Sequence, residues 1–132
     1  MTDGHRSIEL IHARNFVTGL STPAFLVDAD GALAFYNDAA SVLLGRRFEE
    51  MGQSDESEWA TAFQALDEEG NELPLDALPL VRALRRRHAA FDKIRFRAAD
   101  GVVRDIHVTA IPILTSRATH GALALFWSED DA

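Results

Sequence analysis

Cysteine is absent from the 132 residues of this sequence. Its absence excludes disulfides, thiolate metal sites, a cysteine nucleophile and any chromophore held through a thiol, and it fits a reducing compartment. The sequence also lacks an apolar run near the roughly 20 residues of a membrane span, and its first residues lack the apolar core of a signal peptide. We therefore expect a soluble, cytoplasmic protein without a membrane partner.

Basic residues are scarce, with 13 Lys and Arg against 21 Asp and Glu and a formal net charge of −8. Such a chain repels polyanions, so nucleic acid is not an expected partner. Hydrophobic residues make up 47% and charged residues 26%, which is the balance of a globular protein. The length indicates a single domain over 1–132, with an N-terminal helix at about 7–20 and a core at about 21–128.

Motifs of enzyme chemistry are also missing. The sequence has no Walker-type phosphate loop, no His-Glu-x-x-His and no Gly-rich dinucleotide turn. Asp105 and His107 share one face of an expected strand, an arrangement that can order a general base, but no nucleophile or second acid is spaced to complete a set. A surface ion pair explains them more simply. We predict that the chain is not an enzyme and holds no metal, with a small α+β enzyme as the minor alternative.

The stretch from Ala24 to Ser41 is the most informative part of the sequence. Two short apolar runs flank Asp28-Ala29-Asp30-Gly31, whose Asp-Gly pair is typical of a hairpin turn. Asn37 or Asp38 can cap the start of a following helix, and Gly45 can supply the left-handed residue that ends it. The stretch therefore predicts a hairpin followed by a short helix.

The segment 7–20 has helical periodicity, and its main apolar face is predicted to comprise Leu10, Ala13, Phe16, Val17 and Leu20. Ile8 and Ile11 fall outside that face. They form either the contact of a homodimer or an exposed stripe at a chain end.

The middle of the chain is predicted to be irregular over 45–57 and helical over 56–66. Asp55 and Glu58 have the spacing of a capping box, and Trp59, Phe63 and Leu66 share one helical face. Trp59 is a core anchor or, alternatively, a residue that stacks on a ligand.

A further helix is expected before residue 88, with Asp76 as its N-cap and Pro79 in its first turn. Its end is basic, Arg85-Arg86-Arg87-His88. Cations at a helix C-terminus are favoured by the helix dipole, so this is either an ordinary solvated helix end or a docking patch for an acidic partner.

The last third alternates with the period of strands. Ile94 and Phe96 should face the helices with Ile106 and Val108, whereas Lys93, Arg95, Asp105 and His107 should face away. In contrast, the segments 24–27 and 121–127 are apolar on both faces, which is typical of central strands.

A hairpin, several short helices and three strands joined by hairpins resemble a PAS sensor domain, from about Phe16 to Trp127. The motifs that carry this resemblance are the 24–41 stretch, the segments 66–74 and 78–84, Asp100-Gly101, and the segments 108–113 and 121–126. The resemblance implies an α+β fold with a five-stranded antiparallel sheet in the order 2-1-5-4-3. Short helices would cover one face, and the N-terminal helix would flank the other.

Cofactor-binding members of the PAS family hold the cofactor through particular residues that this chain lacks. A flavin–cysteinyl adduct is excluded because there is no cysteine. Haem-binding members use a histidine in the helix before the third strand, where this chain has only His88, at or beyond the helix end. We therefore expect no cofactor.

The resemblance implies a stand-alone regulatory module in signal transduction that associates with a separate signalling protein. The second apolar stripe of Ile8 and Ile11, and a last strand without a polar face, predict a homodimer. A small apolar ligand in the core would control it, or the chain is chiefly a sensor or carrier of an apolar or lipid-like molecule. The alternative to a ligand pocket is a core filled by its own side chains. The candidate ligand-binding residues are Leu44, Phe48, Trp59, Phe63, Leu84, Ile94, Phe96, Ile106 and Val108, and the candidate dimer residues are Ile8, Ile11, Leu123, Leu125 and Trp127.

Overall fold

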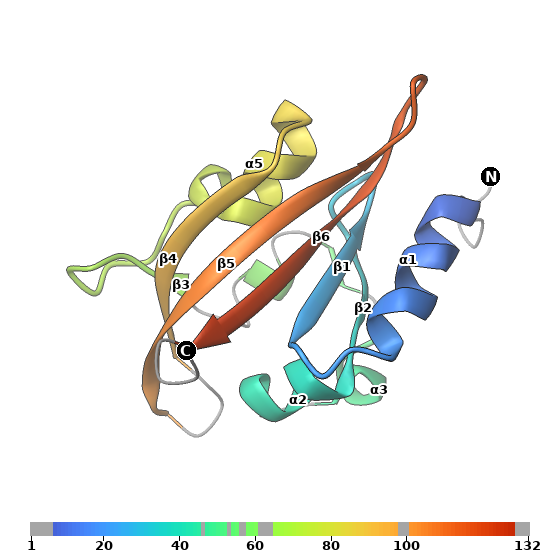
Figure 1. The fold of residues 1–132 in the computed structure, drawn as a ribbon. Coiled ribbons are helices and arrows are strands. Elements are labelled where there is room, and N and C mark those ends of the chain that lie inside the picture. Colours follow the sequence, from blue (N-terminus) through green and yellow to red (C-terminus); the bar gives the residue numbers. More distant parts are fainter. Residues whose placement is uncertain are drawn as a thin grey trace.

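A computed structural model describes residues 7–45, 47–52, 54–55, 58–60, 65–97 and 101–128 (Figure 1). None of the helices in these ranges is long and apolar enough to cross a membrane. In chain order the elements are α1 (Ile8–Thr18), β1 (Ala24–Asp28), β2 (Leu33–Tyr36), α2 (Asp38–Leu44), α3 (Phe48–Met51), β3 (Ala65–Leu66), the 3-10 turn η1 (Leu75–Ala77), α5 (Pro79–Arg86), β4 (Ala90–Arg97), β5 (Val103–Leu114) and β6 (Thr119–Ser128).

The strands form one antiparallel sheet in the order β2-β1-β6-β5-β4-β3. Without β3 this is the predicted five-strand order, with the two doubly apolar strands, β1 and β6, side by side at the centre. The sixth strand is short and lies at the edge, where Ala65 and Leu66 pair with Phe96 and Arg95. The prediction of helix through Leu66 was therefore wrong. Pairing with the edge of β4 satisfies backbone groups there and buries Leu66.

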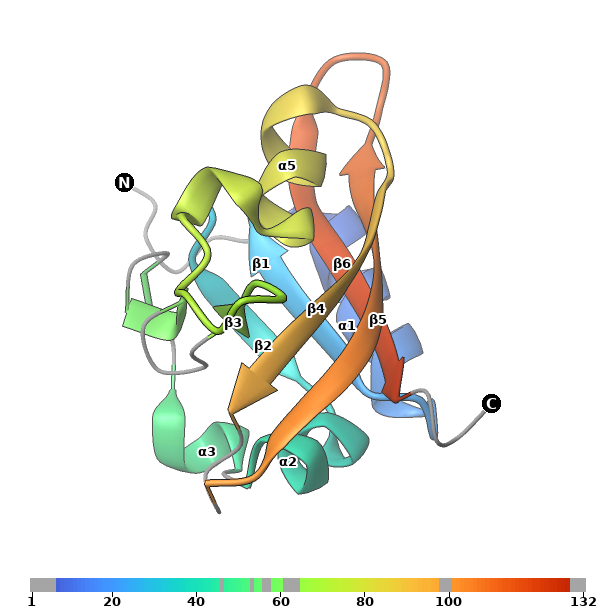
Figure 2. The same ribbon diagram turned by 90° about the vertical axis from the view of Figure 1, so that its left-hand side faces the viewer.

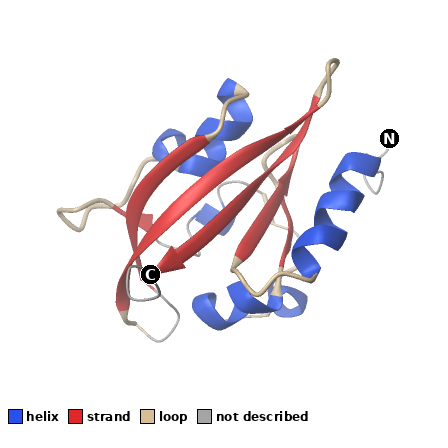
Figure 3. Ribbon diagram, in the orientation of Figure 1, coloured by secondary structure: helices blue, strands red, loops and turns tan. Residues whose placement is uncertain are grey.

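Helices lie on both faces of the sheet. Figure 2 shows α5 in front of the strands and α1 behind them, and Figure 3 shows the same two layers around the strands. On the α5 side Phe96, Ile106 and Val108 are buried, and Ile94 packs against them. Lys93, Arg95, Asp105 and His107 are on the opposite face, as predicted, so the strand register inferred from alternation is confirmed.

Helix α1 packs on the sheet with a narrower face than predicted. Leu10 and Val17 are buried, and Leu10 contacts a small cluster around Leu26 and Ala34. Phe16 is 62% exposed, which corrects its assignment to the packed face. It lies about 100° around the helix from Val17, so a sheet that contacts one line of residues leaves it outside.

The opening hairpin and its helix form as the local chemistry predicts. The Asp28 carboxylate accepts hydrogen bonds from the Asp30 and Ala32 N–H groups at 2.9 and 3.0 Å, and Gly31 has φ 85°. Helix α2 begins after Asn37 and ends at Gly45, which is left-handed with φ 78°. The predicted capping box is also present, because Asp55 and Glu58 exchange side chain to backbone hydrogen bonds of 2.9 Å.

Two further predictions need correction. The expected irregular stretch contains the short helix α3. Asp76 does not cap α5, because it lies within the turn η1 and Leu78 occupies the capping position. Asp76 instead lies 3.5 Å from Arg85 in an exposed ion pair. Pro79 does begin α5, where its missing N–H removes no helical hydrogen bond.

Asn37 is a buried polar residue that joins three elements. Its side-chain oxygen accepts from the Ala24 N–H at 3.1 Å and the Ala40 N–H at 3.0 Å. Its amide nitrogen donates to the Val17 and Thr22 carbonyls, both at 2.9 Å. The side chain therefore ties the end of α1, the start of β1 and the first turn of α2 together.

Candidate functional site

A cavity of about 80 Å³ lies between α5 and the inner face of the sheet. The described residues that line it are all hydrophobic and come from helices, strands and the segment before β3. They are Phe25, Leu44, Trp59, Ala60, Ala65, Leu78, Pro79, Leu80, Ile94, Phe96, Ile106, Val108, Ala124 and Phe126. Strand alternation and the apolar face of α5 together direct these side chains inward.

Aromatic contacts hold one wall of the cavity. Phe25 packs edge-on against Trp59 with centroids 5.5 Å apart and lies parallel to Tyr36 at 5.7 Å. The Trp59 indole N–H donates to the Gly31 carbonyl at 2.8 Å, inside the hairpin turn. The ring is therefore fixed by one polar contact at its edge while its apolar surface lines the cavity.

The structure brings together most of the predicted ligand-binding residues. Leu44, Trp59, Ile94, Phe96, Ile106 and Val108 line the cavity. Phe48 does not, because it packs against Phe35 and Tyr36 with centroid distances of 5.3 and 5.6 Å. Leu84 is buried in the same core but does not line the cavity. Phe63 lies outside the described residues.

Several lining residues were missed by sequence reasoning. The alternation in β6 already placed Ala124 and Phe126 on one face, and Phe25 lies on the corresponding face of β1. These three could have been predicted from the pairing of the two central strands. No sequence pattern placed Leu78, Pro79 and Ala65 at the cavity, because their positions depend on the path of the chain around β3 and η1.

The chemistry of the cavity restricts what could occupy it. Its described lining offers no charged group and no side-chain hydroxyl, so a ligand there would be held by apolar contact. His88, the candidate haem ligand, is exposed beyond the end of α5 and is not part of the lining. Among the described residues no group of three or more His, Asp or Glu is placed to hold a metal ion.

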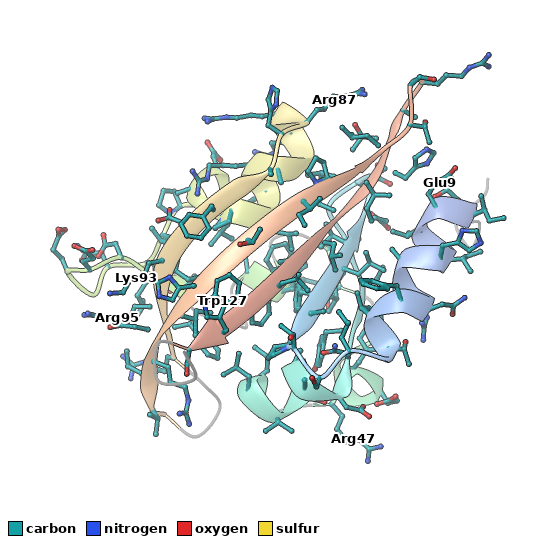
Figure 4. The ribbon with its side chains drawn as sticks, in the orientation of Figure 1. Glu9, Arg47, Arg87, Lys93, Arg95 and Trp127 are labelled. Carbon is teal, nitrogen blue, oxygen red and sulfur yellow. The ribbon has the colours of Figure 1, made fainter. Side chains whose placement is uncertain are left out.

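The outer face of the sheet has mixed chemistry. Leu123, Leu125 and Trp127 are half-buried there, and the His107 and Trp127 rings stack with centroids 5.8 Å apart. Asp105 is bound to Arg95 at 2.8 Å, and this hydrogen bond lowers the pKa of the Asp105 carboxyl. A carboxylate held ionised by a guanidinium is a weak proton acceptor, which favours a structural ion pair at this position. Lys93, Arg95 and Trp127 lie along this face in Figure 4.

The fold is similar to that of solved PAS domains and of a LOV protein. The PAS domain of Bordetella pertussis BvgS has 18% sequence identity and a TM-score of 0.60, with 91% of this chain and 84% of that chain covered. The PAS domain of the fruit-fly ELK potassium channel has 14% identity and a TM-score of 0.69, with 91% and 96% covered. The Rhodobacter sphaeroides LOV protein has 14% identity and a TM-score of 0.71, with 93% and 68% covered.

These likenesses, together with the strand order, show that the chain has the PAS fold. No family model matches the sequence, and no curated protein matches it. The fold predicted from the hairpin, caps and strand alternation is confirmed, with β3 as an additional edge strand.

Proposed function

We propose that this chain is a sensory and regulatory module that acts in signal transduction by protein association, under the control of a small apolar ligand. The observation that carries the proposal is the apolar cavity between α5 and the sheet of a PAS fold. Its described walls come from α2, α5, five strands and the segment before β3, so a ligand there would contact most of the structural elements at once. The proposal assigns no catalytic step to the chain.

The volume of the cavity favours sensing over carrying. An engineered apolar cavity of about 150 Å³ in another protein holds benzene, whereas drug-sized ligands need roughly 300 Å³ or more. The cavity of about 80 Å³ suits a ligand smaller than benzene, or benzene after the walls move outward. A lipid-like cargo would require the separation of α5 from the sheet, so the carrier hypothesis is the less favoured one.

Small apolar molecules are expected to raise the melting temperature of the purified, colourless protein. A ligand at about ten times its Kd stabilises the folded state by about 1.4 kcal/mol, which corresponds to a rise of roughly 4–8 °C. Thermal unfolding should be followed with a panel of apolar ligands no larger than benzene, which includes xenon and benzene, with benzoate as the charged control. Native mass spectrometry and an absorbance scan should measure any ligand that the protein retains from expression.

Ala124→Val is the matched variant for this experiment, because Ala124 lines the cavity from a central strand and is itself buried. Two added methyl groups should occupy the space and remove the ligand-dependent rise without lowering stability. An unchanged melting temperature across the panel in the wild-type protein would overturn control by a small apolar ligand. A visible chromophore at near-stoichiometric occupancy would do the same.

The association that we propose includes a homodimer through α1 and the outer sheet face. Ile8 and Ile11 are 61% and 45% exposed on α1, and Leu125 and Trp127 are only half-buried on the outer face of the sheet. Such apolar side chains are what a second subunit would cover. The dimer is expected to exist at micromolar concentration.

Ile11→Glu should shift the protein from dimer to monomer, measured by light scattering, because a carboxylate would be buried unpaired at the contact. Its unfolding temperature as a monomer should change little. Val42→Glu is the control, since Val42 is exposed on α2 and the change adds the same charge elsewhere. A wild-type monomer at these concentrations, or equal effects of the two substitutions, would contradict the dimer.

A further inference from the structure

We infer that the C-terminal end of α5 is a docking surface for an acidic segment of a partner protein. The same segment also carries an apolar residue that packs beside the basic side chains. This inference rests on the proposed association with a signalling protein. The surface, called here the α5 basic end, consists of Arg85, Arg86, Arg87, His88 and Phe91. All five residues are exposed, and Figure 4 shows Arg87 at the end of the helix.

The charge of the α5 basic end contrasts with that of the chain. The protein has a formal net charge of −8, yet Arg85, Arg86 and Arg87 are consecutive. Arg85 lies 3.5 Å from the Asp76 carboxylate, but Arg86 and Arg87 form no ion pair with the residues that the structure describes. Two unpaired guanidinium groups on neighbouring residues can bind carboxylates in the bidentate geometry that lysine does not offer.

The backbone conformation of Arg87 indicates that an arginine at this position lowers the stability of the fold. Arg87 has φ 60° and ψ 33°, and among the described residues no other non-glycine residue has positive φ. Side chains with a Cβ are strained in this left-handed conformation, and glycine is the usual residue there. Helix α2 ends on Gly45 in the same conformation. Because Arg85 and Arg86 already place cations in the last turn of α5, the helix dipole gives no reason for a third.

Phe91 supplies the apolar part of the surface. It is 66% exposed near the start of β4, four residues after Arg87. It faces the outer side of the sheet opposite Thr109, and the exposed Ile111 is its diagonal neighbour on β5. An exposed aromatic ring that follows the unpaired arginines by four residues, at the turn from α5 into β4, adds a residue type that is enriched in protein interfaces.

The surface suits a protein segment better than a polyanion. Membrane-binding sequences typically carry about four to eight clustered Lys or Arg residues, and nucleic acid would be repelled by the net charge of −8. A short segment with two or three carboxylates and one large apolar side chain matches both unpaired guanidiniums and Phe91. The association should weaken as salt is raised, because the contacts are at the surface.

Selection from a random peptide library on the immobilised wild-type protein tests the inference without a known partner. The enriched peptides should carry acidic residues next to an aromatic or aliphatic one, and a synthetic peptide of the most enriched sequence serves as the probe for all variants. Fluorescence anisotropy measures its Kd. Arg86→Ala and Phe91→Ala should each raise that Kd about tenfold, whereas Arg97→Ala, which removes an exposed charge elsewhere on β4, should leave it unchanged.

Arg87→Gly gives the sharpest result, because binding and stability should move in opposite directions. It should raise the Kd about tenfold while it raises the melting temperature by roughly 2–5 °C, since glycine relieves the left-handed conformation. Arg87→Asn should weaken binding equally with a smaller thermal gain. A purely structural role for Arg87 predicts a change in melting temperature with no change in Kd.

Enrichment without an excess of acidic residues, or equal binding to wild-type and Arg87→Gly proteins, would overturn the inference. So would tighter binding to phosphatidylserine vesicles or to a single-stranded 20-nucleotide DNA than to the selected peptide. These outcomes leave the proposed ligand control intact, because only the cavity experiments can refute that proposal. An unchanged melting temperature across the apolar panel, together with acidic peptides whose binding depends on Arg87, would refute control by a ligand and support the docking surface.

Discussion

Trp59→Ala is expected to lower the free energy of unfolding by about 4 kcal/mol, within the usual range for a buried tryptophan truncated to alanine. Trp59 is only 5% exposed, packs edge-on against Phe25 and donates its indole N–H to the Gly31 carbonyl. The substitution removes these contacts, enlarges the cavity and leaves the hairpin carbonyl without this donor. Urea unfolding followed by circular dichroism measures the loss.

The same variant also tests the cavity. Indole should bind the enlarged space and restore part of the lost stability, because it replaces both the ring and the N–H group. Trp127→Ala is the matched control, since Trp127 is half-buried on the outer face, where its loss should cost less and indole should not restore it. A loss below about 1 kcal/mol for Trp59→Ala would contradict the role of Trp59 as a core anchor. A selective loss of ligand-induced stabilisation would then make Trp59 a binding residue.

Asn37→Ala is expected to cost about 3–4 kcal/mol, although it removes few apolar contacts. The side chain is 2% exposed and satisfies the Ala24 and Ala40 N–H groups and the Val17 and Thr22 carbonyls. Each buried backbone group left without a partner costs roughly 1–3 kcal/mol, less where water can enter. Losing the helix cap adds about 1 kcal/mol. Asn15→Ala, at an exposed position of α1, should change stability by less than about 0.5 kcal/mol.

Amide hydrogen exchange gives a second readout for Asn37→Ala. Protection should fall first in α1 and in the opening turn of α2, because Asn37 joins both to the start of β1. Protection in β4 and β5, which Asn37 does not contact, should follow only the global loss of stability. A uniform decrease across the molecule would contradict the role of Asn37 as the link between α1 and the sheet.

Signals that act within a few residues predicted much of the fold. Asp28 and Gly31 form the turn, Asn37 and Gly45 cap the two ends of α2, and Pro79 begins α5. These features were predictable because each of them depends on hydrogen bonds or backbone angles of nearby residues. The alternation in β4 and β5 placed Ile106 inside and His107 outside, because successive strand residues face opposite sides.

Contacts between distant segments decided the rest. Leu66 is in a strand and not in the predicted helix because the edge of β4, some 30 residues later, pairs with it. Phe16 is exposed because the sheet contacts only the line of Leu10 and Val17 on α1. The sequence by itself determined the central strands, the caps and six of the residues that line the cavity. Whether the space between α5 and the sheet is filled depends on how closely separate elements approach, so only the tertiary structure decided that a cavity of about 80 Å³ remains.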